Sequence, residues 1–170
     1  MSCRPLILSL LLSLACASSS FAGDKEKSEK AEKAPAVSST ESMKLLDLVQ
    51  TKDYKAVWAS IFKGEYSPPL WVLHYDAEST GMTEVTAADG KTFSIGSMCK
   101  ASDCANDRLL VAFSADHKKG WALEITVPTG LGADGVAHPK KYASLRWYNQ
   151  PDPATKKVIM SYLEKDPGWK

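Results

Sequence analysis

A strict alternation of side chains over residues 121–127 constrains the fold of this chain more than any other feature. Large apolar side chains stand at every second position: Trp121, Leu123, Ile125 and Val127. Ala122, Glu124 and Thr126 stand between them. Because successive side chains of a β-strand point to opposite faces of the sheet, this period of two predicts a half-buried antiparallel strand.

Segments on both sides of this strand predict further strands of the same sheet. Residues 83–87 and 92–98 are strand-like, and the turn between them contains Gly90, which supplies the positive φ of a tight hairpin. Residues 109–113 alternate in the same way, and residues 145–147 indicate a last strand. The centre of the chain therefore predicts an antiparallel sheet.

Apolar residues recur at helical spacing before this strand-rich region. The pattern predicts helices at residues 43–50 and 52–63. The second helix is expected to be capped by Thr51 or Asp53 and to end at Gly64.

A further helix is predicted at the C-terminal end. Asp152-Pro153 is typical of a helix start, because proline fits the first turn. The buried stripe of this helix is expected to be Val158, Ile159, Tyr162 and Leu163. By contrast, Pro68 and Pro69 exclude helix, so residues 70–75 are expected to be a short strand or an extended segment. The fold class is α+β: a single domain over residues 42–170, with a central antiparallel β-sheet flanked by N-terminal and C-terminal helices.

The N-terminus has the pattern of a secretory signal peptide. Arg4 precedes an apolar run, residues 6–15, that is too short for a membrane span of about 20 residues. Ser20-Phe21-Ala22 fits a cleavage site, so residues 1–22 are predicted to be removed on export. The protein is therefore expected to be periplasmic, with no membrane span, and lipidation at Cys16 is the alternative.

Residues 23–41 are predicted to be a disordered charged spacer. They mix Lys and Glu with small residues and offer almost no large apolar side chain, so they cannot bury enough surface to offset their ordering entropy. An exposed single helix stabilised by pairs such as Glu26 with Lys30 is the alternative.

Charge and motifs exclude several functional classes. The chain has 21 basic and 20 acidic residues, a net charge of +1, whereas nucleic-acid-binding domains usually have a pI above about 9. No nucleic-acid partner is therefore expected. The sequence has no HExxH, GxSxG or Walker pattern, and His74, His117 and His138 lack metal-ligand spacing. No catalytic residue, cofactor or metal is predicted, and the protein is not expected to be an enzyme.

Two short patterns could be mistaken for functional motifs. Residues 130–135 match GxGxxG, but Pro139 leaves no room for the helix that would hold a dinucleotide, so a flexible loop between two strands is expected. Ser114, Asp116 and His117 are close in sequence, which does not establish the spatial arrangement of a catalytic triad.

Export would leave two cysteines, Cys99 and Cys104, in an oxidising compartment. They are expected to form one disulfide. Two interpretations of the closed loop remain open. It is either a plain structural staple or a rigid polar loop whose tip offers Lys100, Ser102 and Asp103 for binding.

The segment Cys-Lys-Ala-Ser-Asp-Cys, residues 99–104, resembles the Cys-Lys-Pro-His-Asp-Cys loop of the inhibitor of vertebrate lysozyme family, known as Ivy. The segment Asp-Arg-Leu-Leu-Val-Ala-Phe-Ser at 107–114, the Leu-Arg-Trp strand at 145–147 and the tail at 163–168 are similar to the family as well. The resemblance covers roughly residues 42–170.

The resemblance implies an antiparallel sheet flanked by helices and a periplasmic inhibitor of c-type lysozyme. In the family the disulfide loop enters the cleft of the enzyme, with its His near the catalytic carboxylates. Here Ala101 replaces the proline and Ser102 replaces the histidine, whereas Lys100 and Asp103 are kept. Serine has a shorter reach and cannot carry a positive charge.

The favoured hypothesis is a periplasmic inhibitor of a lysozyme-type muramidase, with residues 100–103 as the target-binding loop. Its partner would be a lysozyme or another muramidase, and the inhibitor itself would be a monomer or a homodimer. The alternative is an envelope protein of this fold that does not inhibit c-type lysozyme. Such a protein would control lytic transglycosylases or bind another partner.

Overall fold

The computed structural model describes residues 36–38 and 43–170. The expected signal peptide lies outside the described residues, as does most of the expected spacer. Within the span of that spacer, β1 (Ala36–Ser38) pairs with β3 (Thr83–Thr86).

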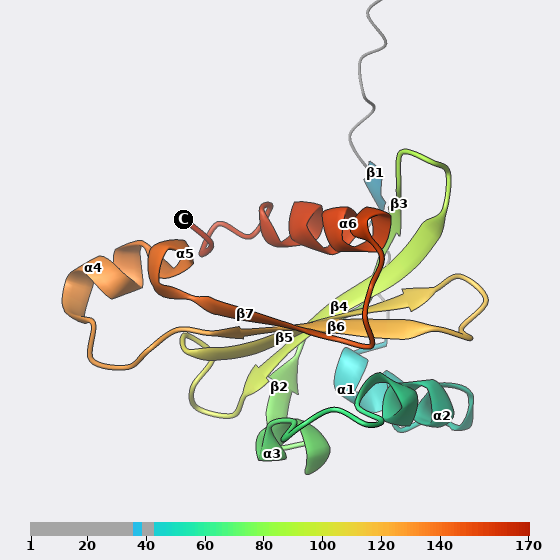
Figure 1. The fold of residues 1–170 in the computed structure, drawn as a ribbon, viewed down its shortest axis with the longest axis horizontal. Coiled ribbons are helices and arrows are strands. Elements are labelled where there is room, and N and C mark those ends of the chain that lie inside the picture. Colours follow the sequence, from blue (N-terminus) through green and yellow to red (C-terminus); the bar gives the residue numbers. More distant parts are fainter. Residues whose placement is uncertain (1–35, 39–42) are drawn as a thin grey trace, which may run out of the picture. The chain divides into compact units, whose positions relative to one another are not determined.

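An antiparallel sheet forms the centre of the described chain (Figure 1). The order along the sheet is β1, β3, β4 (Thr92–Lys100), β5 (Asp107–Ser114), β6 (Gly120–Thr126) and β7 (Ser144–Tyr148). A short strand, β2 (Ala77–Ser79), pairs with the end of β4. The predicted hairpin is confirmed as β3 and β4, with Gly90 at a φ of 84°. The predicted α+β class is confirmed as well.

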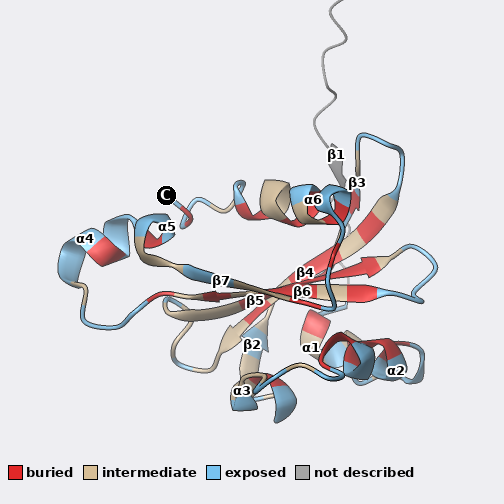
Figure 2. Cartoon of the chain, in the orientation of Figure 1, coloured by how far each residue is buried: buried red, intermediate tan, exposed pale blue. Residues whose placement is uncertain are grey.

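Helices cover both faces of this sheet (Figure 2). One face packs against α1 (Leu45–Leu48) and α2 (Lys52–Ile61), and the other packs against α6 (Pro153–Leu163). The side chains of β5 therefore divide between two cores: Val111 faces the first, whereas Leu110 faces the second. Because both faces are covered, every residue from 109 to 113 is buried.

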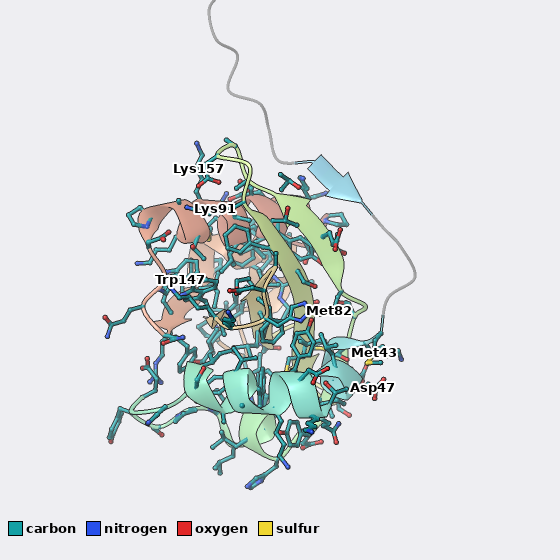
Figure 3. All side chains as sticks on the ribbon, turned by 90° about the vertical axis from the view of Figure 1, so that its right-hand side faces the viewer. Met43, Asp47, Met82, Lys91, Trp147 and Lys157 are labelled. Atoms are coloured by element: carbon teal, nitrogen blue, oxygen red, sulfur yellow. A yellow bond between two sulfur atoms is a disulfide. The ribbon has the colours of Figure 1, made fainter. Side chains whose placement is uncertain are left out.

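Glycine and small residues let the first helical layer approach the sheet closely. A Cβ on Gly120 would lie 2.9 Å from Ile61 Cδ1 of α2. Ala122, the next β6 residue on that face, is fully buried. Met82 packs in the same core (Figure 3). The predicted half-buried strand is thus also buried on its second face at Gly120 and Ala122, whereas Glu124 and Thr126 on that face are half-buried.

Because Pro68 and Pro69 precede residues 70–75, a short strand or an extended segment was expected there. This prediction is wrong. Residues Leu70–Leu73 form α3, a single turn with Pro69 at its N-cap and Val72 buried. The first residues of a helix donate no intrahelical hydrogen bond, so prolines directly before the helix do not prevent it. The prolines exclude helix only up to Pro69.

The prediction of a flexible loop at residues 130–135, between the last two strands, is also wrong. The segment between β6 and β7 contains α4 (Gly132–Ala137) and α5 (Pro139–Tyr142). Helix α4 ends before Pro139, and Pro139 begins α5, where its missing N–H breaks no bond. The strands on either side, β6 and β7, are antiparallel, so the segment is not a dinucleotide-binding unit.

The C-terminal helix begins as predicted. Asp152 is the N-cap of α6, and its Oδ1 accepts a hydrogen bond from the Thr155 backbone N–H at 2.7 Å. Val158, Ile159 and Leu163 are buried against the sheet, whereas Tyr162 is half-buried. The hydrogen bonds from Thr155 hold the pKa of Asp152 below its ordinary value.

Replacing Asp152 with Ala should lower the free energy of unfolding by about 1 kcal/mol at neutral pH, because the Thr155 N–H loses its acceptor. Asp152→Asn keeps an acceptor oxygen and is the matched control, with a much smaller loss expected. Urea unfolding measures both variants.

Because the pKa of Asp152 is lowered in the folded state, the charged cap stabilises the protein above the ordinary carboxyl pKa. Its contribution disappears as the pH falls through the lowered pKa. A gap between wild type and Asp152→Ala that stays constant into strong acid would contradict this assignment.

Candidate functional site

The connection between β4 and β5 carries the predicted disulfide. Cys99 and Cys104 are bonded to each other, five positions apart. Cys99 lies at the end of β4, where it pairs with Arg108 of β5 on one side and Glu78 of β2 on the other. The base of the closed loop is therefore fixed by strands on both sides.

Backbone hydrogen bonds fix the rest of the loop. The Asp103 N–H donates to the Lys100 carbonyl at 2.9 Å, and the Asn106 N–H donates to the Asp103 carbonyl at 3.1 Å. The Ala101 N–H donates to the carbonyl of Asp76 at 3.2 Å, which ties the loop to the segment before β2. A loop with this many internal bonds loses little entropy when it binds.

Ser102 occupies the tip of the loop. Its φ is 64°, in the left-handed region that few residues other than glycine adopt. It is exposed, whereas Ala101 and Asp103 on either side of it are half-buried. The tip therefore presents a hydroxyl group to solvent.

Lys100 is held within the loop by two carboxylates. Its Nζ lies 3.4 Å from Asp103 Oδ2 and 3.5 Å from Asp107 Oδ2. The hydrogen bond to Asp103, together with the negative charges of Asp103 and Asp107, raises the pKa of Lys100. The sequence placed Lys100, Ser102 and Asp103 together at the tip. The structure instead presents Ser102 outward and pairs the other two.

Arg108 lies next to the disulfide, because it pairs with Cys99 across the strands. The sequence did not single it out. Its Nη1 donates to Asp166 Oδ2 at 2.5 Å, and its guanidinium lies 5.6 Å from the centre of the buried Trp169 ring. The C-terminal tail is thus anchored to the start of β5. The similarity of the tail to the family was the only signal in the sequence that could have indicated this contact.

Within the described part of the chain, the other polar side chains singled out in the sequence make local turn and ring contacts. The Ser114 Oγ donates to Asp116 Oδ1 at 2.6 Å, and the Lys118 N–H donates to the same oxygen, which is an ordinary turn arrangement. The ring of His117 packs against the ring of Tyr54 at an interplanar angle of 36°, with the ring centres 4.7 Å apart. Among residues 36–38 and 43–170, no cluster of three His, Cys, Asp or Glu side chains could hold a metal ion. Over the same residues, no helix combines the length and the apolar character needed to cross a bilayer.

Comparison with known proteins gives a consistent result. The family described as "Inhibitor of vertebrate lysozyme (Ivy)" matches residues 53–161, which is more than half of the chain and includes the disulfide loop. Over 130 residues the chain is 36% identical to the inhibitor of vertebrate lysozyme of Pseudomonas aeruginosa, covering 76% of this chain and 84% of that protein.

Two further relatives carry no functional name. An uncharacterized protein of Pseudomonas aeruginosa is 32% identical over 168 residues, covering 98% of this chain and 97% of the relative. An uncharacterized protein of Yersinia pestis is 34% identical over 134 residues, covering 79% of this chain and 84% of the relative.

Proposed function

Because this chain belongs to the family of inhibitors of vertebrate lysozyme, we propose that it is a periplasmic inhibitor of a lysozyme-type muramidase. The inhibitor acts by inserting the loop of residues 99–104 into the active-site cleft. The observation that carries the proposal is the disulfide-closed loop itself, which is clamped by two strands and exposes Ser102 at its tip.

The geometry suits the target. A retaining glycosidase presents two carboxyl groups about 5–5.5 Å apart in a groove built for a sugar chain. The loop is a narrow, polar turn of fixed conformation, so it can occupy the groove while the surrounding surface excludes substrate and water. Inhibition of this kind needs no reacting group on the inhibitor.

Two features support the periplasmic location. The N-terminal sequence has the pattern of a signal peptide, and structural disulfides form and persist mainly in oxidising compartments such as the periplasm. Intact-mass measurement of the protein purified from the cell envelope tests this. The expected mass lacks residues 1–22 and rises by two hydrogens on reduction. A lipid-modified Cys16 would contradict it.

A second candidate function rests on the serine at the loop tip. Ser102 has no imidazole to place between the catalytic carboxylates of a c-type lysozyme. A muramidase of another type, such as an endogenous lytic transglycosylase, would then be the target.

One titration tests both candidates. The exported protein, residues 23–170, is titrated against a c-type, a g-type and an i-type lysozyme and a lytic transglycosylase, with cell-wall lysis as the readout. Stoichiometric inhibition of at least one enzyme is expected. If none of the four enzymes loses activity, the proposal is overturned and the loop is a structural staple.

Replacing Lys100 with Ala should weaken inhibition by about tenfold. The change removes the cation that neutralises Asp103 and Asp107, so two carboxylates would face the carboxylates of the target without compensation. Inhibition constants measured at low and high salt test this, because the loss should shrink as salt screens the repulsion.

Lys118→Ala is the matched control. Lys118 lies in the turn between β5 and β6, at the opposite end of β5 from the loop, and the change alters the net charge equally. Equal weakening by both variants would show that overall charge, rather than the loop, governs binding.

A further inference from the structure

A cavity of about 470 Å³ opens beside the disulfide loop. On one side it is lined by Cys104, Ala105 and Asn106 of the loop. On the other side it is lined by Leu131, before α4, and by Val136 of α4, which lies at one end of the domain in Figure 1. The cavity and the loop therefore share a wall at the disulfide.

The GxGxxG segment builds the far wall of this cavity. Gly130 and Gly132 have φ values of 79° and 64°, and no atom lies within 4 Å of the position that a Cβ would take on either. Gly135 lies under Leu131, where a Cβ would overlap that side chain. Gly135 thus makes room for Leu131, and Gly130 and Gly132 adopt a backbone conformation that few other residues take.

The lining favours an apolar occupant. Val127, Pro128, Leu131 and Pro139 supply apolar surface, and Val136 is 83% exposed at the rim. Arg108 is the one charged residue of the lining, and its guanidinium is already bound to Asp166. An anion or a sugar would find few unengaged polar groups among these residues, whereas an apolar side chain would be well covered.

We propose that this cavity receives an apolar side chain of the same muramidase whose cleft the loop enters. The inference rests on the proposed function. Its warrant is continuity, because an enzyme surface that surrounds residues 99–104 reaches the cavity mouth at Cys104 and Ala105. Protein interfaces place apolar anchors of one partner in such pockets of the other. The loop then blocks the cleft, and the cavity supplies affinity.

Two variants test the cavity without touching the loop. Val136→Glu places a charge at the rim, and Thr129→Trp fills the cavity from its exposed wall. Each is expected to raise the inhibition constant by about tenfold for the muramidase that the wild type inhibits best. Both residues are exposed, and thermal melting verifies that each variant folds.

Met43→Glu is the matched control. Met43, which is labelled in Figure 3, is 55% exposed and lies two residues before α1. In Figure 1, α1 lies away from α4, whose residues line the cavity. The inhibition constant of Met43→Glu should equal that of the wild type.

The outcomes separate the two proposals. If the wild type inhibits a muramidase and both cavity variants inhibit it equally well, the cavity inference is wrong while the proposed function stands. If the wild type inhibits no muramidase, the proposed function fails and the inference fails with it.

Amide spectra test whether the muramidase or a saccharide reaches the cavity. The signals of Gly130, Gly132 and Gly135 should shift when the muramidase is added and should stay in place with a chitin oligosaccharide. Shifts with the oligosaccharide and none with the enzyme would overturn the inference and indicate a saccharide site.

Discussion

Replacing Ser102 with His is expected to strengthen inhibition of c-type lysozyme by about tenfold or more, equivalent to about 1.4 kcal/mol. The imidazole reaches farther than a hydroxyl and can carry a positive charge between the two catalytic carboxylates. The backbone can accept it, because the φ of 64° at this position lies in a region where His is enriched. Inhibition constants for a c-type lysozyme test the variant.

Ser102→Asn is the matched control, because Asn also accepts a positive φ but carries no charge. A gain from His that strengthens as the pH falls, and no such gain from Asn, would support the charge-based explanation. Equal constants for wild type and Ser102→His would contradict the insertion mechanism for c-type lysozyme.

Adding Ala101→Pro to Ser102→His would rebuild the family's loop sequence, and the double variant should also surpass the wild type. The structure indicates an opposing effect. Proline stiffens the loop but lacks the N–H that Ala101 donates to Asp76, a bond worth about 1 kcal/mol. Comparing the double variant with Ser102→His alone measures which effect is larger.

Removing the disulfide should lower both the stability of the protein and its inhibition of the muramidase. The double variant Cys99→Ser, Cys104→Ser loses about 2 kcal/mol on the chain-entropy model, which corresponds to a fall of about 4–8 °C in melting temperature. Inhibition should weaken by at least about tenfold, because the loop must then be ordered upon binding.

Reductant supplies the control for this experiment. Treating the wild type with reductant should reproduce both changes, whereas the same treatment of the double variant should change nothing. Undiminished inhibition by the fully reduced wild type would show that the disulfide only staples the fold.

Membership of the Ivy family was predictable from the sequence and is confirmed by the family match. The same holds for the strands with a clear period of two and for the capped C-terminal helix. These features were predictable because each depends on residues that are neighbours in the chain. A strand period, a cap or a pair of cysteines five positions apart is visible locally.

The short helices after Pro69 and after β6 were not predictable, whereas α1 lies within the helix predicted at residues 43–50. Helices α3 and α5 have four residues each, too few for a helical period to be visible, and isolated helices of this length are unstable in water. Their buried residues, such as Val72 and Pro139, hold them against the rest of the domain. Tertiary packing therefore decides their conformation.

Neighbouring residues in the sequence indicated strands β3 to β7, the flanking helices α1, α2 and α6, and the cysteine pair that closes the loop. How the loop presents its groups depends on contacts between segments that are distant in the chain. Asp107 reaches Lys100, and Asp166 fixes Arg108 from a tail that is 58 positions away. The cavity joins residues 104–108 to residues 127–139. Contacts between segments so far apart in the chain leave no periodic signal in the sequence, because they exist only once the sheet has brought those segments together.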